Sequence, residues 1–350
     1  MLSSVPPSVV NAVLACFPER EIEDVKVLAG RSHVNYAFTF ADGGAGVLCR
    51  EQQNPVPHLD AYFGGESSLR RQLAVLGLLR EAGIPVPDVY QGDESAPRPY
   101  ALLSYLNGVT FAEYMKSRQH HLPDFFNALR NLGHTLSATR SILFDRFGDI
   151  QPDGIGNGST SLAERVAHIF ERHWSHARLT TYFTEDEQVE LRAWVRASVD
   201  GLRHWIAAPH LVVYDQHSRS LLVDPSTGKV SGIFDVEFAQ AGPAELEVAC
   251  ASMQLFGLYG RNQFAAARAA FLEGYGAVAS GPEGVVLEQC FMLNHFLSAT
   301  LNLYDGVVDG IRDEWSQAFA RAALDVIRGS YDPAVLENLK RAVTGFPSFD

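Results

Sequence analysis

The sequence predicts an α+β fold of two lobes, a small N-terminal lobe rich in strands and a larger, mostly helical C-terminal lobe. Short alternating runs typical of strands fill most of the chain up to about residue 108, and helical periodicity dominates from Phe111 onward. A separate β-unit, LVVYDQHSRSLLVDPSTGKVSGIFDVE (211–237), interrupts the helical part. We therefore expect lobes at 1–104 and 105–350, joined by a segment near 102–108.

Composition places the chain among ordinary globular proteins and argues against nucleic-acid binding. The 350 residues are 47% apolar and 20% charged, enough for two cores. The net charge is −13, from 28 basic and 41 acidic residues, whereas nucleic-acid binding needs a basic surface. The acidic balance is compatible with a cationic substrate and also with solubility alone.

The cysteines and the N-terminus predict a cytoplasmic protein. The four cysteines (Cys16, Cys49, Cys250 and Cys290) are scattered in apolar surroundings, without a CxxC pair or a Cys/His cluster. Buried free thiols in a reducing compartment are therefore expected, rather than disulfides or structural zinc. The N-terminus has no basic region typical of a signal peptide, and no apolar run reaches the length of a membrane span.

The N-terminal lobe is expected to contain one helix, a meander of strands and a second helix. Prolines bound a short helix over 5–20, and KVLAG, NYAFTF and GVLCRE alternate as strands. Leucines recur at helical spacing in SSLRRQLAVLGLLREAG, which ends at Gly83. Two further strand-like runs, IPVPDVYQG and PYALLSYLNG, complete the small lobe.

The C-terminal lobe is expected to be helical around its β-unit. FAEYMKSR and DFFNALRNLGHTLSATRSIL are amphipathic, and glycine-rich DGIGNGST (153–160) is predicted to be a loop. Capping boxes at Ser161–Glu164 and Thr184–Glu187 each open a helix, the second leading to Ala208. Residues 244–343 are again helical.

In the β-unit, three apolar runs surround two carboxylates. LVVY, LLVD and SGIF are predicted to be buried strands, and Pro225–Gly228 a tight turn between two of them. Asp215 then lies in a loop and Asp235 at a strand end, twenty residues apart. Two carboxylates on rigid backbone suit a site that handles a proton and a divalent cation.

These motifs resemble the aminoglycoside phosphotransferase family, which has a protein-kinase-like fold. The family's LVHGDLHPGNLLVD and GVIDWE resemble LVVYDQHSRSLLVD and GIFDVE, with the spacing of the two aspartates kept. GPAELEVA (242–249), GIPVPDVY (83–90) and ALLSYLNGVT (101–110) resemble further family motifs, in the same order from about residue 25 to 260.

The resemblance implies phosphoryl transfer from ATP or GTP to a hydroxyl group, with Mg²⁺ as cofactor. Asp215 stands where the family has its catalytic aspartate, and Asp235 where it has a metal-binding aspartate. The second metal position is Ser220. The implied nucleotide contacts lie in a loop (Ser32, His33), at a strand end (Arg50), in a helix (Gln72) and in the connecting segment (Leu103, Ser104, Tyr105, Leu106).

Three positions depart from the family pattern. Val213 replaces the histidine of the catalytic loop, Ser220 replaces the metal-binding asparagine, and Gln72 replaces the glutamate that pairs with the phosphate-contacting base. Glu66 lies close enough in sequence to substitute for that glutamate. These departures keep a second hypothesis open, a pseudokinase that binds a nucleotide or a partner without chemistry. No GxSxG or HExxH motif supports a hydrolase.

The acceptor is left open by the sequence. The implied acceptor side includes His217 and Glu237, and acidic residues there would suit an aminoglycoside-like substrate. Other antibiotics or natural-product intermediates, in resistance or biosynthesis, and a Ser or Thr of a precursor peptide are alternatives. The oligomeric state is equally open, and no membrane partner is expected. The acidic candidates are Glu245, Glu247, Asp305, Asp309, Asp313 and Glu314.

Overall fold

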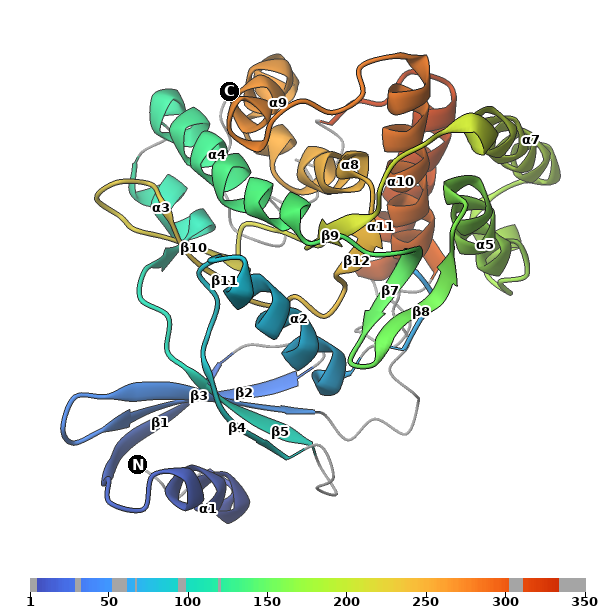
Figure 1. The fold of residues 1–350 in the computed structure, drawn as a ribbon. Helices are drawn as coiled ribbons and strands as arrows, with labels where there is room; N and C mark the ends of the chain where they lie inside the picture. Colours follow the sequence, from blue (N-terminus) through green and yellow to red (C-terminus); the bar gives the residue numbers. More distant parts are fainter. Residues whose placement is uncertain are drawn as a thin grey trace.

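A computed structural model describes the protein over residues 5–28, 33–51, 62–66, 68–93, 99–118, 121–301 and 311–333, with only the backbone of 311–314. The small N-terminal part is built on a five-stranded antiparallel sheet in the order β1-β2-β3-β5-β4 (Figure 1). Its strands are β1 (Ile22–Leu28), β2 (His33–Phe40), β3 (Ala45–Glu51), β4 (Val89–Asp93) and β5 (Tyr100–Ser104).

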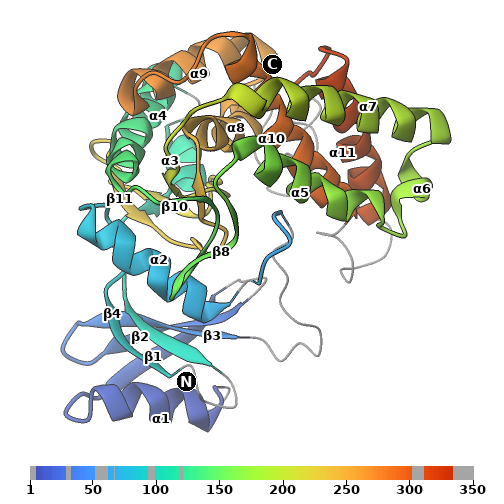
Figure 2. The same cartoon turned by 45° about the vertical axis from the view of Figure 1, so that its right-hand side comes forward.

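Two helices cover this sheet on opposite faces (Figures 1 and 2). Helix α1 (Pro7–Cys16) buries Val9 and Val13 against Phe38, Phe40 and Leu48. Helix α2 (Leu69–Glu81) lies between the sheet and the rest of the molecule, and Ser68 caps its first turn by accepting a hydrogen bond from the Arg71 amide. The predicted antiparallel meander and main helix are therefore confirmed.

The larger part of the chain is helical, as predicted. Helix α4 (Leu122–Ser137) packs along α9 (Arg261–Tyr275). The two helices approach closely because each contributes a glycine at the contact. A Cβ at Gly133 would lie 2.2 Å from the Phe271 carbonyl oxygen, and one at Gly274 would lie 2.0 Å from that of Arg130. The helices are α3 (Phe111–Ser117), α4 (Leu122–Ser137), α5 (Leu162–Trp174), α6 (Leu179–Tyr182), α7 (Glu185–Gly201), α8 (Ala244–Gln254), α9 (Arg261–Tyr275), α10 (Pro282–Leu301) and α11 (Ile311–Ile327), with short 3-10 turns at Ala138–Ser141, Leu202–His204 and Phe256–Tyr259.

The predicted β-unit is divided between two small sheets. Strands β10 (Leu221–Val223) and β11 (Val230–Ile233) form the expected hairpin, and β10 also pairs with β6 (Val109–Thr110). The first predicted strand, β9 (His210–Val212), instead joins a four-stranded sheet in the order β8-β7-β12-β9. The loop 213–220 therefore crosses from one sheet to the other. The remaining strands of the second sheet are β7 (Phe147–Gln151), β8 (Gly154–Ser159) and β12 (Gln240–Gly242).

Three local predictions are corrected by the structure. The glycine-rich stretch 153–160, predicted to be a loop, is mainly strand β8, because its backbone pairs with β7 although it carries few side chains that favour strands. At Ser161 only half of the capping box forms, since the Glu164 carboxylate accepts from the Ser159 hydroxyl instead. The Thr184–Glu187 box is complete, but its helix ends at Gly201, short of Ala208.

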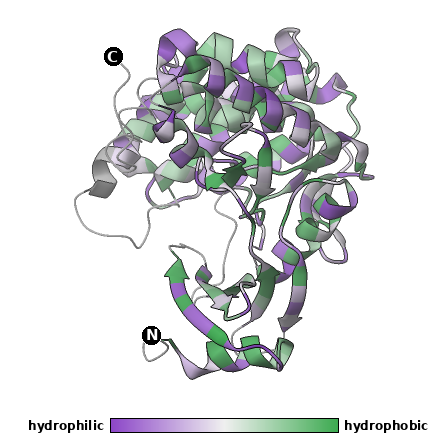
Figure 3. Ribbon diagram, turned by 90° about the vertical axis from the view of Figure 1, so that its left-hand side faces the viewer, coloured by the Kyte–Doolittle hydropathy of each residue, from purple (hydrophilic) through white to green (hydrophobic). Residues whose placement is uncertain are grey.

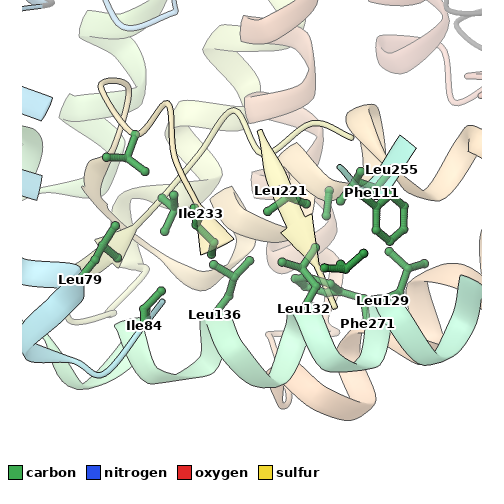
Figure 4. Close-up of a cluster of buried hydrophobic side chains, with 14 of the residues drawn as sticks. Leu79, Ile84, Phe111, Leu129, Leu132, Leu136, Leu221, Ile233, Leu255 and Phe271 are labelled. Carbon is green, nitrogen blue, oxygen red and sulfur yellow. The ribbon is translucent and has the colours of Figure 1, made fainter. Parts of the chain in front are cut away.

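One apolar core connects the sheet-rich and helical parts. Leu79 of α2 and Ile84 belong to the same buried cluster as Leu132 and Leu136 of α4 and Ile233 of β11 (Figure 4). Hydrophobic and hydrophilic residues are interspersed along many of the strands and helices (Figure 3). The β10–β11 hairpin that leads to Asp235 therefore rests on a packed core.

Candidate active site

Asp215 lies in the loop that follows β9, and its backbone is in the left-handed region. Four non-glycine residues in the described part of the chain have positive φ, and three are Tyr214 (52°), Asp215 (53°) and Asp235 (63°). Such conformations cost free energy for residues with a Cβ and occur preferentially at functional sites. The surrounding structure therefore holds both predicted carboxylates in backbone conformations that a relaxed loop would avoid.

The loop before Asp215 is held by a buried glutamate. Glu247 of α8 is 1% exposed, and its Oε2 accepts a hydrogen bond of 2.8 Å from the Val213 amide. Burial raises the pKa of Glu247 to about 7, although the Val213 and Tyr214 amides lower it. Val213, where the resemblance expects a histidine, is itself fully buried. The carboxylate of α8 thus supports the start of the loop.

Two side chains from distant parts of the chain hydrogen-bond to Asp215. The Tyr62 hydroxyl and the Gln254 side-chain amide both lie 3.3 Å from its Oδ1. Tyr62 precedes α2, whereas Gln254 ends α8. Neither residue is recognisable in the sequence, because both lie outside the family motifs and no local pattern marks them.

The end of the loop is closed by Ser220. Its side chain is fully buried, and its hydroxyl lies 3.1 Å from both the amide nitrogen and the carbonyl oxygen of His217. His217 Nε2 lies 3.9 Å from Asp235 Oδ2, so the loop also contacts the strand end that carries the second carboxylate. The Ser220 hydroxyl therefore shapes the loop, and its role as a metal ligand stays a prediction.

Asp235 follows β11 and has a second carboxylate beside it. Its side chain is partly exposed, with 44% of its surface open to solvent. Burial and the charge of Glu237 raise the pKa of Asp235 to about 6, although His33 lowers it. Ionisation of Asp235 is thus harder than that of an exposed aspartate, and a bound cation would favour it.

Glu237, predicted to lie on the acceptor side, faces the N-terminal sheet instead. Its Oε2 lies 3.6 Å from Nδ1 of His33 in β2, and both side chains are buried. This ion pair, when His33 is protonated, joins β2 to the segment after β11. The nucleotide contact of His33 stays a prediction, and its neighbour Ser32 lies outside the described residues.

The groups around Asp235 suit Mg²⁺ that is held partly by phosphate oxygens and water. They do not suit a metal ion that is held by protein ligands alone. Mg²⁺ typically takes one or two carboxylates and completes its shell with phosphate oxygens and water. Asp235 offers such a carboxylate, and its raised pKa indicates unrelieved negative charge. Among the described residues, no group of three or more His, Cys, Asp or Glu side chains could hold a metal.

The structure contradicts the predicted direction of Arg50. Residues of β3 alternate between the faces of the sheet, and the Arg50 guanidinium reaches Ser8 of α1 at 3.1 Å, on the face away from α2. Its neighbour Cys49 packs with the α2 cluster and is 3% exposed. Burial, with the charges of Glu237, Asp235 and Glu51, raises the pKa of the Cys49 thiol. A neutral thiol thus occupies a position of β3 at which the charges of Glu237 and Asp235 are felt.

Helix α2 presents Gln72 without a hydrogen-bond partner for its side-chain oxygen. Gln72 is 6% exposed, and its Oε1 is buried and unpaired among the described residues. Glu66, considered as a substitute for the absent glutamate, is exposed, and its carbonyl lies 3.4 Å from Arg71 Nη1. Arg71 is fully buried, and its other terminal nitrogen donates to the Ala239 carbonyl at 2.6 Å. Arg71 therefore connects α2 to the segment after Asp235. The sequence alone did not single out this residue.

The predicted connecting segment Leu103–Leu106 links β5 to the helical part. The Ser104 amide donates to the Asp88 carbonyl at 2.8 Å, and its hydroxyl accepts from the Asp88 amide. The amide of Ser104 is therefore engaged within the sheet. Tyr105 is 49% exposed. A purine contact from this segment stays a prediction.

The acidic candidates for acceptor binding lie elsewhere than predicted or outside the described side chains. Glu245 is 4% exposed and accepts a hydrogen bond of 2.9 Å from the Ala279 amide. Together with the buried position of Glu247, this contradicts direct contact of either residue with an acceptor. Asp305 and Asp309 lie outside the described residues, as do the side chains of Asp313 and Glu314.

Comparison with known proteins matches this arrangement to one family. The sequence model of the phosphotransferase enzyme family matches residues 25–285, most of the chain. No curated protein matches the chain. Within the described residues, no helix has the length and apolar character that crossing a membrane requires.

Several solved structures share the fold over nearly their whole length. A putative fructosamine-3-kinase from Thermobifida fusca has a TM-score of 0.62 at 17% identity, over 92% of this chain and 98% of that one. The gentamicin complex of APH(2")-IIa gives 0.60 at 12% identity, over 91% and 96%. Amicoumacin kinase hAmiN in complex with AMP-PNP, Ca²⁺ and Ami gives 0.55 at 15% identity, over 92% and 94%. At these identities the likeness shows the protein-kinase-like fold.

Proposed function

Because the chain belongs to the phosphotransferase enzyme family, we propose that it transfers the terminal phosphoryl group of ATP or GTP to a hydroxyl of a small molecule. The acceptor is an aminoglycoside-like compound, another antibiotic or a natural-product intermediate, in resistance or biosynthesis. The carrying observation is the pair Asp215 and Asp235, both held at positive φ beyond the ends of two strands. Strain of this kind is retained where side-chain position matters for chemistry.

The proposed roles of the two carboxylates follow from their surroundings. Asp215, restrained by Tyr62 and Gln254, orients the acceptor hydroxyl and takes its proton as the oxygen attacks phosphorus. Asp235 holds Mg²⁺, which when bound supplies charge neutralisation at the nucleotide phosphates. Catalysis in such sites is mainly positioning and electrostatic stabilisation.

The breadth of the acceptor class is supported by the structural relatives. Their names refer to fructosamine, gentamicin and amicoumacin, which are different small molecules. The burial of Glu245 and Glu247 removes two of the groups that would have favoured a polycationic sugar. A Ser or Thr of a precursor peptide remains an alternative acceptor of the same chemical type, since it offers the same alcohol group.

The test is the substitution Asp215→Asn, assayed with MgATP and MgGTP against a panel of hydroxylated antibiotics, sugars and short peptides. Loss of the base should lower transfer by about 100-fold or more and leave nucleotide binding intact. Asp224→Asn is the matched control, because Asp224 caps the turn after β10 through Ser226, away from Asp215. Full activity of Asp215→Asn would refute the assignment.

A second candidate function is that of a pseudokinase. It is favoured by the residues on the donor side, the part of the site where the nucleotide phosphates are expected. Arg50 faces α1, Cys49 is neutral, and Gln72 has an unpaired oxygen. Thermal shift with ATP separates the two functions. Stabilisation that requires Mg²⁺ supports the enzyme. If ATP raises the Tm equally with and without Mg²⁺, and no acceptor in the panel is phosphorylated, the pseudokinase is supported.

A further inference from the structure

The segment Tyr62–Glu66, which we call the strap, lies against the helical part of the molecule before the chain enters α2. Figure 2 shows it as a short blue stretch near α10. Tyr62 and Phe63 are 5% and 2% exposed, and both belong to the buried cluster formed by α5, α7, α8, α10 and α11. The strap is therefore packed into the helical core, although it precedes the main helix of the N-terminal part.

Polar contacts fix the strap at its first residue. The Tyr62 carbonyl accepts hydrogen bonds from the Asn294 side-chain amide at 2.9 Å and from Arg172 of α5. Arg172 is held in turn by Ser298 at 2.6 Å. These donors come from α5 and α10, so the backbone of Tyr62 has a defined position relative to the helices.

Two glycines allow the strap to approach the helical part closely. A Cβ at Gly65 would lie 2.3 Å from Asp149 Oδ2, and Asp149 is itself held in a buried ion pair with Arg165 at 2.7 Å. Gly64 has φ of 75°, and a Cβ there would lie 3.0 Å from Arg172 Cδ. Side chains at these positions would push the strap away from the helices.

The ring of Tyr62 is also fixed, and its hydroxyl reaches Asp215. The ring stacks on His295 with centroids 4.7 Å apart and an interplanar angle of 17°, and packs edge-on against Tyr214 at 5.2 Å. The hydroxyl then lies 3.3 Å from Asp215 Oδ1, the oxygen that Gln254 also contacts. Two donors on one oxygen restrain the rotation of the carboxylate.

We propose that Tyr62 is a positioning residue for Asp215 and that the strap holds the catalytic loop in the geometry that phosphoryl transfer needs. The inference rests on the proposed role of Asp215 as the base. The hydroxyl donates to the ionised carboxylate, orients it toward the acceptor and favours its charged form. The strap thereby adds a residue from before α2 to the acceptor side of the site.

The first test uses Tyr62→Phe, which keeps the ring and its stacking but removes the donor. Phosphate release from MgATP with water as acceptor is measured across pH, because water requires no knowledge of the natural acceptor. We expect kcat to fall about tenfold, the KM for ATP to stay unchanged and the acidic limb of the profile to move to higher pH. An unchanged profile would overturn the proposal. A rise in rate would also overturn it, since it would show that the hydroxyl obstructs the acceptor.

Tyr214→Phe is the matched control, because Tyr214 is an equally buried tyrosine of the same aromatic group. Its hydroxyl lies 3.0 Å from His295 Nδ1 rather than on Asp215. This variant should share any loss of stability, as judged from Tm, but leave the acidic limb in place. If it moved the limb as far as Tyr62→Phe does, the effect would be general loosening of the cluster and the proposal would fail.

A second measurement separates this inference from the proposed function. The Asp215 carboxyl carbon is followed by NMR in protein with labelled aspartate, with the signal assigned from Asp215→Asn. In Tyr62→Phe the signal should titrate at higher pH than in the parent protein, whether or not the protein turns over ATP. An Asp215 signal with the same titration in both proteins would refute the contact, whereas a shifted signal without turnover would refute only the enzymatic role.

Discussion

The acceptor side and the donor side of the site are supported to very different degrees. Asp215 is reached by Tyr62 and Gln254, and its loop is held by Glu247. On the donor side, Asp235 stands beside Glu237, facing the neutral Cys49. The chain thus places hydrogen-bond donors around Asp215, the proposed base, but sets two carboxylates, Asp235 and Glu237, close together where the nucleotide phosphates are expected. We infer that Mg²⁺ matters more to nucleotide binding here than a fixed side-chain cation does.

The largest effect is expected for Asp235→Asn, which breaks the donor side. If Asp235 holds the metal, the stabilisation of the protein by MgATP should disappear, about 2.7 kcal/mol at a ligand concentration of 100 Kd. Thermal unfolding with and without MgATP measures it. Asp224→Asn is again the control, and retention of the full shift by Asp235→Asn would remove this carboxylate from the metal site.

On the acceptor side, Glu247→Ala should cost stability and activity together. The Val213 amide would lose its buried acceptor, at a cost of about 1–3 kcal/mol in the free energy of unfolding. Glu245→Ala provides the comparison, because Glu245 is similarly buried but accepts from Ala279, away from the loop. Denaturant unfolding should show similar losses for both variants, whereas only Glu247→Ala should lower kcat. Equal activities would contradict the proposed support of the loop.

Cys49→Lys should give the donor side the positively charged side chain that it lacks at this position. A lysine there would face Asp235 and Glu237 and supply the missing cation, so nucleotide affinity should rise about tenfold. Arg50→Ala serves as the contrast, since Arg50 contacts Ser8 of α1 and its loss should leave affinity within about twofold. Binding is measured by calorimetry with ATP and Mg²⁺. A large loss in Arg50→Ala would show that Arg50 turns toward the nucleotide when it binds.

The smallest expected effect is a pH dependence of metal binding. Below the raised pKa of Asp235, about 6, the carboxyl is protonated and a proton competes with the metal. Mg²⁺ affinity in the presence of ATP should therefore be constant above about pH 7 and fall up to tenfold per pH unit below pH 6. Titrations at fixed nucleotide concentration measure it. Affinity unchanged between pH 5 and 7 would contradict the raised pKa of Asp235 and its cause, burial beside Glu237.

The sequence predicted the fold and the places of Asp215 in a loop and Asp235 after a strand, because both depend on local patterns. Strands alternate, helices repeat, and the spacing from Asp215 to Asp235 lies within one continuous stretch. Strand β8 was not predicted, because a glycine-rich stretch has few side chains that favour a strand. It forms a strand because its backbone pairs with β7. The division of β9 and β10 between two sheets is likewise a tertiary property.

Errors at the site arose where facing direction or long-range contact decides the role. In β3, Leu48 and Cys49 are both apolar, so the alternation did not show which face Arg50 shares. Tyr62 and Asp215 are separated by 153 residues, and only the folded chain brings them together. Glu245 and Glu247 were predicted to bind the acceptor, but each carboxylate instead accepts a hydrogen bond from a backbone amide, of Ala279 and Val213 respectively.

The strap also affects how the two parts of the molecule can move. The chain connects them near residues 104–109, where the Ser231 hydroxyl donates to the Asn107 carbonyl at 2.7 Å. The strap is a further attachment, held by Asn294 and by two glycines in close contact. The core around α2 and the hydrogen bond from Arg71 to the Ala239 carbonyl join the same two parts elsewhere. A rotation of the sheet about any one of these attachments would therefore have to break contacts at the others.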